Sequence, residues 1–302
     1  MTPGVEVDVD GRRLSLSNLQ KVMYPATGFT KAQVIDYYTR VAPVVLPHLR
    51  GRALTLKRYP NGVEGKHFYE KQCPSHRPDW VRTAPVDSSH RGDVIHFCVA
   101  DDVATLVWLA NLADLELHTS LAHVADVTCP TILAFDLDPG EPATIVECAR
   151  VAIWLKAVFE ELGLESFPKT SGSKGMQVYV PLNTPTTYDA TKPFAHALAQ
   201  LLERQHPELV LSSMKTSLRG GKVFVDWSQN ADHKTTVCAY SLRARERPTV
   251  STPVRWAEVD ELVERGDPEW LVFDSNAVLE RVGDVGDLFA PVAALEQRLP
   301  DL

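Results

Sequence analysis

The 302-residue chain contains 44% hydrophobic and 23% charged residues, which is typical of a soluble globular protein with a sizeable core. The absence of any apolar run of about 18 residues excludes a predicted membrane span, and MTPGVEVDVDGRRL at the N-terminus does not resemble a signal peptide. The net charge of −8 is unevenly spread, because residues 1–60 carry 9 Lys/Arg against 4 Asp/Glu and residues 166–250 carry 11 against 6. A polyanionic partner is therefore not excluded; solvated basic faces are the alternative.

The five cysteines lie far apart, at positions 73, 98, 129, 148 and 238, and none belongs to a C-x-x-C pair. This spacing argues against a zinc site and against a disulfide framework. The expected compartment is therefore the cytoplasm.

The first strongly periodic segments are helical. Thr30 and Gln33 have the spacing of a capping box, and the apolar residues that follow recur at helical intervals, so a helix is expected over residues 31–48. The stretch DDVATLVWLANLADLELH, residues 101–118, predicts a second and largely buried helix.

Strands and helices then mix without strict alternation. Strands are predicted for TILAF (131–135), MQVYVPL (176–182), KVFVDW (222–227) and TTVCAYSL (235–242). Helices are predicted for 142–163, ended by Gly163 as its cap, and for 191–205. Without a recognisable linker or internal repeat, we expect a single domain over residues 1–302, of mixed α/β or α+β class, with a central sheet covered by helices.

The segment LAFDLDPGE, residues 133–141, places two acids after an apolar run. On a strand, Asp136 and Asp138 point to the same face while Leu137 points into the core. Neighbouring carboxylates raise one another's pKa unless a cation lies between them, and their oxygens suit Mg²⁺ or Mn²⁺. The alternative is a strand end with two solvated aspartates before a Pro-Gly turn.

A second segment, GKVFVDWSQN, repeats this arrangement with Asp226 at the end of an apolar run. Three carboxylates would suffice to bind two divalent ions for in-line attack on a phosphorus centre. Alternatively, Asp226 is a strand-terminal residue that begins a turn.

Candidate phosphate ligands occur in three segments. The loop TSGSKGMQVYV, residues 170–180, combines small residues with Lys174 and suits a phosphate, although an ordinary Ser/Gly turn has the same composition. The segments SLRGGK and SLRARER add Arg219, Lys222, Arg243, Arg245 and Arg247. The last three arginines share one face if their segment is extended, which suits a triphosphate; a charged edge strand is the alternative.

In the N-terminal third, Lys21 precedes a Tyr-Pro turn and Lys31 opens a helix, where a bound anion would explain a basic residue. The stretch LKRYPNGVEGKHFYEK, residues 56–71, interleaves basic residues with aromatic ones, including Phe68 and Tyr69. This pattern is typical of a surface that stacks on unpaired bases. Buried aromatic residues beside solvated lysines are the alternative.

Taken in chain order, these motifs resemble those of one family. NLQKVMYPATGFTK, KRYPNGVEGKHFYEKQ, LAFDLDPGE, TSGSKGMQVYVPL, LRGGKVFVDWSQN and AYSLRARERPTV are similar to the motifs of the polymerase domain of bacterial end-joining DNA ligases, ligase D, and its stand-alone relatives. The resemblance covers about residues 12–255. It implies a stand-alone member of the archaeo-eukaryotic primase superfamily, whose catalytic core has central mixed or antiparallel sheets flanked by helices.

The resemblance also implies roles for individual residues. The divalent-metal triad would be Asp136, Asp138 and Asp226. Contacts to the incoming nucleotide are implied for Lys57, His118, Ser171, Lys174, Gln177, Arg219, Gln229 and Arg243. Among these, His118 would end the second predicted helix and lie at the sugar, as our candidate contact to a 2′-hydroxyl group. DNA contacts are implied for Lys21 and Lys31, at a 5′-phosphate, and for Phe68 and Tyr69, near the templating position.

One position departs from the family pattern, because Gln177 stands where the family commonly has histidine. Glutamine can hydrogen-bond a phosphate but carries no positive charge.

The implied function is DNA-dependent nucleotidyl transfer with two Mn²⁺ or Mg²⁺ ions. The chain would extend a primer 3′-OH with NTPs or dNTPs, prefer ribonucleotides, and fill short 5′-phosphorylated gaps in broken DNA during repair. Expected partners are a separate ATP-dependent ligase and a Ku-like protein, at the nucleoid. Two other functions stay open: a metal-dependent nucleotide phosphohydrolase, which needs no primer, and a non-catalytic module that binds 5′-phosphorylated DNA ends.

Overall fold

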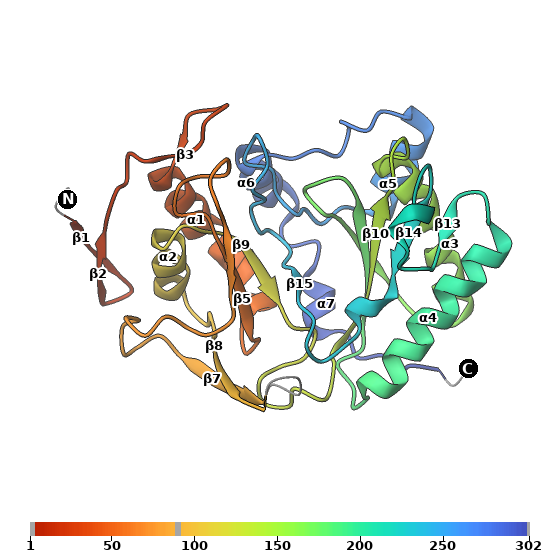
Figure 1. Ribbon diagram of the computed structural model, residues 1–302, viewed down its shortest axis with the longest axis horizontal. Helices are drawn as coiled ribbons and strands as arrows, with labels where there is room; N and C mark the ends of the chain where they lie inside the picture. The colour runs from red at the N-terminus through yellow and green to blue at the C-terminus, as the bar shows by residue number, and fades with distance from the viewer. Residues whose placement is uncertain (1–3, 88–91, 301–302) are drawn as a thin grey trace. The chain divides into compact units, whose positions relative to one another are not determined.

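The chain divides into two structural units in the computed structural model, which describes residues 4–87 and 92–300 (Figure 1). Unit 1 comprises the residues up to Ser120 together with Val237–Val250 and Asp274–Gly286. Unit 2 comprises Leu121–Thr236, Ser251–Phe273 and the residues from Asp287 onward. Among the described residues, every helix is too short or too polar to cross a lipid bilayer.

Unit 1 is built on a six-stranded sheet. Its strand order is β15 (Thr236–Val237), β9 (Asp114–Thr119), β5 (Leu54–Arg58), β8 (Val94–Cys98) and β7 (Thr83–Asp87), and β6 (Phe68–Glu70) pairs with β5. Two hairpins are separate from this sheet: β1 (Val5–Val9) with β2 (Arg12–Leu16), and β3 (Val22–Tyr24) with β4 (Phe29–Thr30). The helices of unit 1 are α1 (Lys31–Leu49), α2 (Val103–Asn111) and α6 (Ser275–Val285).

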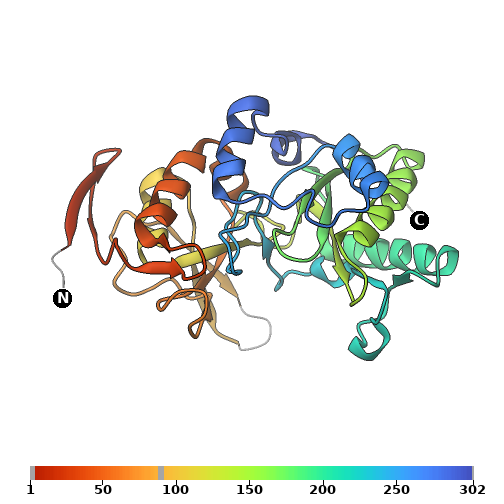
Figure 2. The ribbon, with the colours of Figure 1, turned by 90° about the horizontal axis from the view of Figure 1, so that it is seen from above.

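Helix α1 begins as predicted. The Thr30 hydroxyl accepts a hydrogen bond from the Gln33 backbone, and the Gln33 side chain accepts one from the Thr30 backbone, which completes the capping box. The buried face of α1 includes Tyr37 and Tyr38, whose hydroxyl groups each donate to a backbone carbonyl group. Helix α1 lies beside α2 (Figure 2).

The predicted helix over residues 101–118 is wrong in its second half. Helix α2 ends at Asn111, and Ala113 adopts a positive φ of 59°, which turns the chain out of the helix. The next residues form β9, which pairs antiparallel with β5. His118 therefore lies on a strand rather than at a helix end, because cross-strand pairing outweighs the helix propensity of this Leu- and Ala-rich stretch.

The strand predicted over residues 235–242 is also wrong for most of its length, and the condition for a shared arginine face is not met. Of the strand predicted over residues 235–242, only Thr236–Val237 is a strand. The arginines of SLRARER lie in a turn instead of an extended segment, because the Arg243 backbone N–H donates to the Thr249 carbonyl at 2.7 Å. Arg243 is half-buried whereas Arg245 and Arg247 are exposed, so they do not share one face.

Unit 2 is built on a five-stranded sheet with the order β11 (Phe167–Thr170), β12 (Met176–Pro181), β10 (Ile132–Pro139), β14 (Val223–Asp226) and β13 (Val210–Leu211). The β13–β14 pair is parallel and the other pairs are antiparallel, so the sheet is mixed. Its helices are α3 (Ile145–Glu161), α4 (Tyr188–Gln205), α5 (Trp256–Arg265) and α7 (Ala290–Ala294), with 3₁₀ turns η1 (Thr216–Leu218) and η2 (Trp227–Gln229).

Alternation along β10 separates the core of unit 2 from its polar face. Leu133, Phe135 and Leu137 are fully buried in one hydrophobic cluster with residues of α3 and α4, which lie on that side of the sheet (Figure 1). Asp136 and Asp138 point to the opposite face. The sequence correctly predicted this division.

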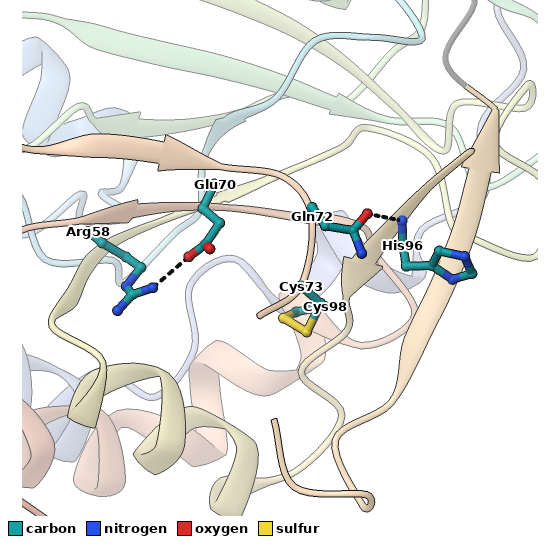
Figure 3. Close-up of a disulfide and its surroundings, with 6 residues drawn as sticks. All are labelled: Arg58, Glu70, Gln72, Cys73, His96 and Cys98. Atoms are coloured by element: carbon teal, nitrogen blue, oxygen red, sulfur yellow. Dashed lines mark hydrogen bonds and ion pairs between the residues drawn. A yellow bond between two sulfur atoms is a disulfide. The ribbon is translucent and has the colours of Figure 1, made fainter. Parts of the chain in front are cut away.

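Unit 1 contains a disulfide bond that the cysteine spacing did not predict. Cys73 and Cys98 are bonded across 25 residues, and both are buried (Figure 3). The Cys73 backbone N–H donates to the His96 carbonyl at 2.7 Å, and the Gln72 side chain accepts from the His96 backbone N–H at 3.0 Å. The bond thus ties the segment after β6 to strand β8.

Candidate active site

A row of polar side chains crosses four strands of the unit 2 sheet. Asp136 on β10 lies opposite Asp226 on β14, and on its other side it lies opposite Gln177 on β12. Gln177 in turn lies opposite Lys169 on β11. Directly opposite residues of antiparallel strands present their side chains on the same face. The row therefore brings two predicted acids and Gln177 together with a lysine that the sequence analysis did not select.

The Asp136 carboxyl group lies in an unfavourable place for a negative charge. Burial and the charges of Asp138 and Asp226 raise the pKa of Asp136 to about 7, against the effects of a hydrogen bond from Gln177 and the charge of Lys169. Carboxylates in this arrangement repel one another unless a cation lies among them. Carboxylate oxygens are the type of donor that a hard divalent ion prefers.

Asp138 faces a basic residue from the segment before β14. Nη1 of Arg219 lies 3.9 Å from Oδ2 of Asp138, and the guanidinium group lies 4.1 Å from the centre of the Phe224 ring. Gly140 permits this approach, because a Cβ atom there would lie 1.9 Å from the Arg219 carbonyl oxygen. The Pro-Gly turn after the acids thus serves to bring Arg219 to Asp138.

Asp226 is held by the turn that follows it. Its Oδ1 accepts hydrogen bonds from the backbone N–H and the hydroxyl group of Ser228, at 3.0 and 2.6 Å, and its Oδ2 accepts one from Nε2 of Gln229 at 2.7 Å. Within residues 4–87 and 92–300, no three His, Cys, Asp or Glu side chains are gathered into a group that could hold a metal ion. The three predicted acids share one face of two adjacent strands, but they are not gathered as ready metal ligands, and the oxygens of Asp226 bond to Ser228 and Gln229.

The predicted phosphate loop lies against β10. The Ser171 hydroxyl accepts hydrogen bonds from the backbone N–H groups of Ser173 and Gly175, at 3.2 and 3.1 Å, which fixes the shape of the loop. Nζ of Lys174 donates to Glu141 at 2.9 Å, and these side chains are 63% and 83% exposed. An exposed ion pair contributes little to stability, so Lys174 can exchange Glu141 for another anion.

Three predicted nucleotide ligands surround a buried carboxylate in unit 1. Glu116 on β9 is 2% exposed. Nζ of Lys57 lies 3.2 Å from its Oε1, and Nε2 of His118 lies 3.1 Å from its Oε2. Nε of Arg243 lies 3.3 Å from the same Oε2. The structure therefore gathers Lys57, His118 and Arg243 into one basic cluster around a single negative charge.

The two lysines predicted to bind a 5′-phosphate lie in adjacent backbone segments, because the Lys31 N–H donates to the Lys21 carbonyl at 2.8 Å. The Lys21 side chain is exposed, whereas Lys31 is 5% exposed and its Nζ donates to the Ser17 carbonyl at 2.7 Å. Burial and the charge of Lys21 lower the pKa of Lys31 to about 8. Lys31 is the first residue of α1, as predicted.

Phe68 and Tyr69 are exposed, at 43% and 59%, so the alternative of buried aromatic residues is wrong for this pair, although it holds for Tyr59, which is 3% exposed. Arg58 lies over the Phe68 ring and Lys57 over the Tyr69 ring, at 5.2 and 5.5 Å from the ring centres. Tyr69 also makes an edge contact with the His118 ring, with 6.1 Å between ring centres. The aromatic pair therefore lies next to the basic cluster around Glu116.

Two buried charged residues of these clusters, Glu116 and Lys169, were not predicted from the sequence. Lys169 is fully buried, and its Nζ donates to the Ser251 hydroxyl at 2.6 Å. The polar residues of DLELH alternate with leucines, which is the pattern of a strand and could have indicated Glu116. The helix predicted over the same residues led to the opposite interpretation. Lys169 directly precedes the predicted phosphate loop in the sequence. Its position in the polar row is apparent only from its pairing with Gln177 across strands β11 and β12.

Comparisons with known proteins identify the family of this chain. A family model described as the LigD primase-polymerase domain matches residues 30–289. The chain is 42% identical over 284 residues to the multifunctional non-homologous end joining protein LigD of Mycolicibacterium smegmatis, and 43% over 296 residues to the LigD of Mycobacterium tuberculosis. These alignments cover 93% of this chain but 36% and 38% of the relatives, so the chain spans less than two fifths of their length.

Among solved structures, the polymerase domain of Mycobacterium tuberculosis ligase D in complex with DNA matches with a TM-score of 0.87 and 42% identity. The match covers 94% of this chain and 99% of that one. The family model and the structural match together define a primase-polymerase, a DNA-directed polymerase of the nucleotidyltransferase class. Within that class, the chain belongs to the LigD primase-polymerase domain family. The predicted family and the mixed α/β class are thus confirmed, and the family's nucleotidyl transfer depends on divalent metal ions.

Proposed function

We propose that this chain fills short 5′-phosphorylated gaps and breaks in DNA by extending a primer 3′-OH with NTPs or dNTPs, preferring ribonucleotides. The observation that carries the proposal is the pairing of Asp136 with Asp226, beside Asp138, in a chain of this family. The solved structure of a related polymerase domain with DNA supports the same class of substrate here.

Asp136, Asp138 and Asp226 are the residues that would hold two divalent ions, Mn²⁺ or Mg²⁺. The raised pKa of Asp136 supports this assignment, because its causes include the charges of the other two acids, whose repulsion a cation relieves. When bound, such ions supply charge neutralisation to the attacking and leaving oxygens of an in-line displacement.

The residues proposed to contact the nucleotide form one set within each unit. Those from unit 2 are Ser171, Lys174, Gln177, Arg219 and Gln229, and those from unit 1 are Lys57, His118 and Arg243. The exposed pair of Lys174 with Glu141 supports a phosphate role for the lysine, since a triphosphate offers more negative charge than one carboxylate. Gln177 acts in this scheme through Asp136, to which it hydrogen-bonds.

The proposed DNA contacts lie in unit 1. Lys21 and Lys31 would bind the 5′-phosphate, and the exposed rings of Phe68 and Tyr69 would stack on bases near the templating position. We further propose one functional domain over residues 1–302, since the family model runs across both units. A separate ligase and a Ku-like protein would act on the same DNA ends, in the cytoplasm at the nucleoid.

Primer extension on a one-nucleotide gap tests the proposal. The assay compares NTPs with dNTPs, Mn²⁺ with Mg²⁺, and a 5′-phosphate with a 5′-hydroxyl group. Asp136→Asn should abolish extension while leaving gap binding within about twofold, because it removes a charge without changing the side-chain shape. The matched control is Asp189→Asn, a change of an exposed acid at the start of α4, which should extend like the wild type.

A second readout follows metal binding without activity. Adding Mn²⁺ should raise the melting temperature of the wild type but not that of Asp136→Asn, because an ion that binds only the folded chain stabilises it. Gap binding without extension by the wild type would instead favour the end-binding module. Release of phosphate from nucleotides without a primer would favour the phosphohydrolase.

A further inference from the structure

The buried carboxylate of Glu116 has contacts from an unusually large number of polar and basic groups. Besides its three basic partners, it accepts hydrogen bonds from the Tyr59 hydroxyl at 3.3 Å and the Ala244 backbone N–H at 3.1 Å. These five groups, four hydrogen-bond donors and the ion-paired Arg243, come from strands β5 and β9, the segment just after β5, and the turn that carries Arg243. A buried charge is tolerated only with such pairing, so Glu116 fixes all these segments relative to one another.

The ionisation of Glu116 decides what its neighbours can do. Burial raises the pKa of Glu116, but the hydrogen bond from His118 and the charges of Arg243 and Lys57 outweigh it and hold the pKa well below its ordinary value. An ionised carboxylate can only accept hydrogen bonds. In the contact with Glu116, Nε2 of His118 must therefore be the donor.

The protonation of the His118 ring follows from the same surroundings. Burial and the charges of Arg243 and Lys57 lower the pKa of His118, although Glu116 acts in the opposite direction. The ring is therefore neutral at neutral pH, with its one proton on Nε2. Its other nitrogen, Nδ1, then carries a lone pair and presents an acceptor.

We infer that Glu116 is a positioning residue of the nucleotide site, which holds Lys57 and Arg243 in place and fixes the His118 tautomer so that Nδ1 accepts a hydrogen bond from a sugar hydroxyl. The inference rests on the proposed function and names the group that makes the sugar contact selective. A ribose 2′-hydroxyl can donate to Nδ1, whereas a deoxyribose has no hydroxyl group at that position. The two positive charges of Lys57 and Arg243 exceed the one negative charge of Glu116, so the cluster keeps an excess positive charge for a phosphate group.

The tautomer can be measured in the free protein. Nitrogen-15 NMR of the histidine rings at about pH 7.5, with the His118 signals assigned by their loss in His118→Gln, distinguishes a protonated nitrogen from a bare one. We expect Nε2 to be protonated and Nδ1 to be bare. A ring protonated on Nδ1, or on both nitrogens, would overturn the inference, whether or not the chain is a polymerase.

The kinetic test compares two buried acids on strand β9. Glu116→Gln removes the charge with little change of shape, and its amide group can donate to the ring and favour the other tautomer. Asp114→Asn is the matched control, because Asp114 is fully buried two residues away on the same strand, where burial raises its pKa. Single-nucleotide insertion at a gap gives kcat and KM for ATP and dATP with each variant, and thermal unfolding checks the fold.

We expect Glu116→Gln to raise KM for ATP about tenfold or more and to reduce the preference for ATP over dATP by a similar factor. Gap affinity should change by less than about twofold, and Asp114→Asn should keep the wild-type preference. An unchanged preference in folded Glu116→Gln would refute the inference. If the wild type inserted nothing, the proposed function would fail, and equilibrium binding of ATP and dATP to the same variants would still decide the role of Glu116.

Discussion

Gln177 lies directly opposite Asp136 on neighbouring strands, and a hydrogen bond from its side chain favours the charged form of the aspartate. The amide group thus performs one task that a histidine at this position could also perform, namely donation to a carboxylate. The departure from the family pattern therefore does not remove the support of Asp136.

The first prediction concerns this hydrogen bond. Gln177→Leu should reduce primer extension about tenfold, because the leucine leaves the Asp136 carboxylate without its donor. Gln177→His should stay within about threefold of the wild type, since the imidazole can donate in the same direction. Both are measured by single-turnover extension on a gapped duplex. Equal activity of Gln177→Leu and the wild type would contradict the assigned role.

The second prediction is a pH dependence of stability. Because the pKa of Asp136 is raised to about 7 in the folded chain, the folded state binds more protons than the unfolded state between about pH 4 and 7. The contribution of Asp136 to stability therefore falls as the pH rises through that interval and levels off above it. Asparagine does not titrate, so Asp136→Asn does not lose stability in this way. The free energy of unfolding of Asp136→Asn, relative to that of the wild type, should therefore increase by about 2 kcal/mol from pH 5 to pH 8.

Urea unfolding with a metal chelator present measures this difference, and Asp189→Asn serves as the exposed control. A constant difference between Asp136→Asn and the wild type across the pH range would show that Asp136 is not electrostatically destabilised.

The third prediction concerns the two lysines at the proposed 5′-phosphate site. Since the pKa of Lys31 is lowered to about 8, its charge is lost as the pH rises through that value. The preference for a phosphorylated gap should therefore weaken between about pH 7 and pH 9. Lys21→Gln should lower that preference about fivefold and shift the remaining pH dependence upward, because the charge of Lys21 contributes to the lowered pKa.

Fluorescence binding to gaps with and without a 5′-phosphate gives this preference. Lys156→Gln, on the surface of α3, is the control for a lost lysine charge. A preference that stays constant over the whole pH range would argue against a role for Lys31.

The fourth prediction concerns the disulfide bond in unit 1. The bond between Cys73 and Cys98 closes a loop of 25 residues, and its loss should lower the free energy of unfolding by about 3 kcal/mol. Cys98→Ser measures this effect by urea unfolding, and reducing agent should destabilise the wild type by a similar amount. Cys129→Ser changes a free cysteine and should respond to reducing agent like the wild type. Insensitivity of the wild type to reducing agent would show that the bond is not formed in solution.

Much of the unit 2 site could be predicted from sequence because its determinants are local. The alternation in LAFDLDPGE is a period of two, and it correctly assigned Leu137 to the core and the two acids to the opposite face. Asp226 was likewise predicted from a local pattern, an apolar run that ends in an acid, and it is the last residue of β14. The register that pairs Asp136 with Asp226 lies beyond local pattern, since it depends on strands about 90 residues apart in the chain.

The errors in unit 1 have a common physical cause. The residues of LADLELH favour a helix locally. Ala113 has a positive φ, which alanine rarely adopts, so no residue in this stretch predicted the turn into β9. Pairing with β5 decided the structure there, and it also created the contacts of Glu116. The Cys73–Cys98 bond could not be predicted either. The two cysteines are brought together because β5 pairs with both β6 and β8, and this pairing cannot be inferred from the spacing of the cysteines in the sequence.

The alternation along β10 has a consequence for how this chain can vary. Leu133, Phe135 and Leu137 are fully buried, so most substitutions there should change abundance and melting temperature. Substitutions of Asp136 or Asp138, one position away, should leave a folded chain that lacks turnover. A saturation scan of Phe135 to Asp138, scored separately for expression and for activity, should therefore give two phenotypes that alternate from one residue to the next. Ile132 and Ala134 have the same parity as the acids but are buried, so substitutions there should change stability, and the separation begins only at Phe135.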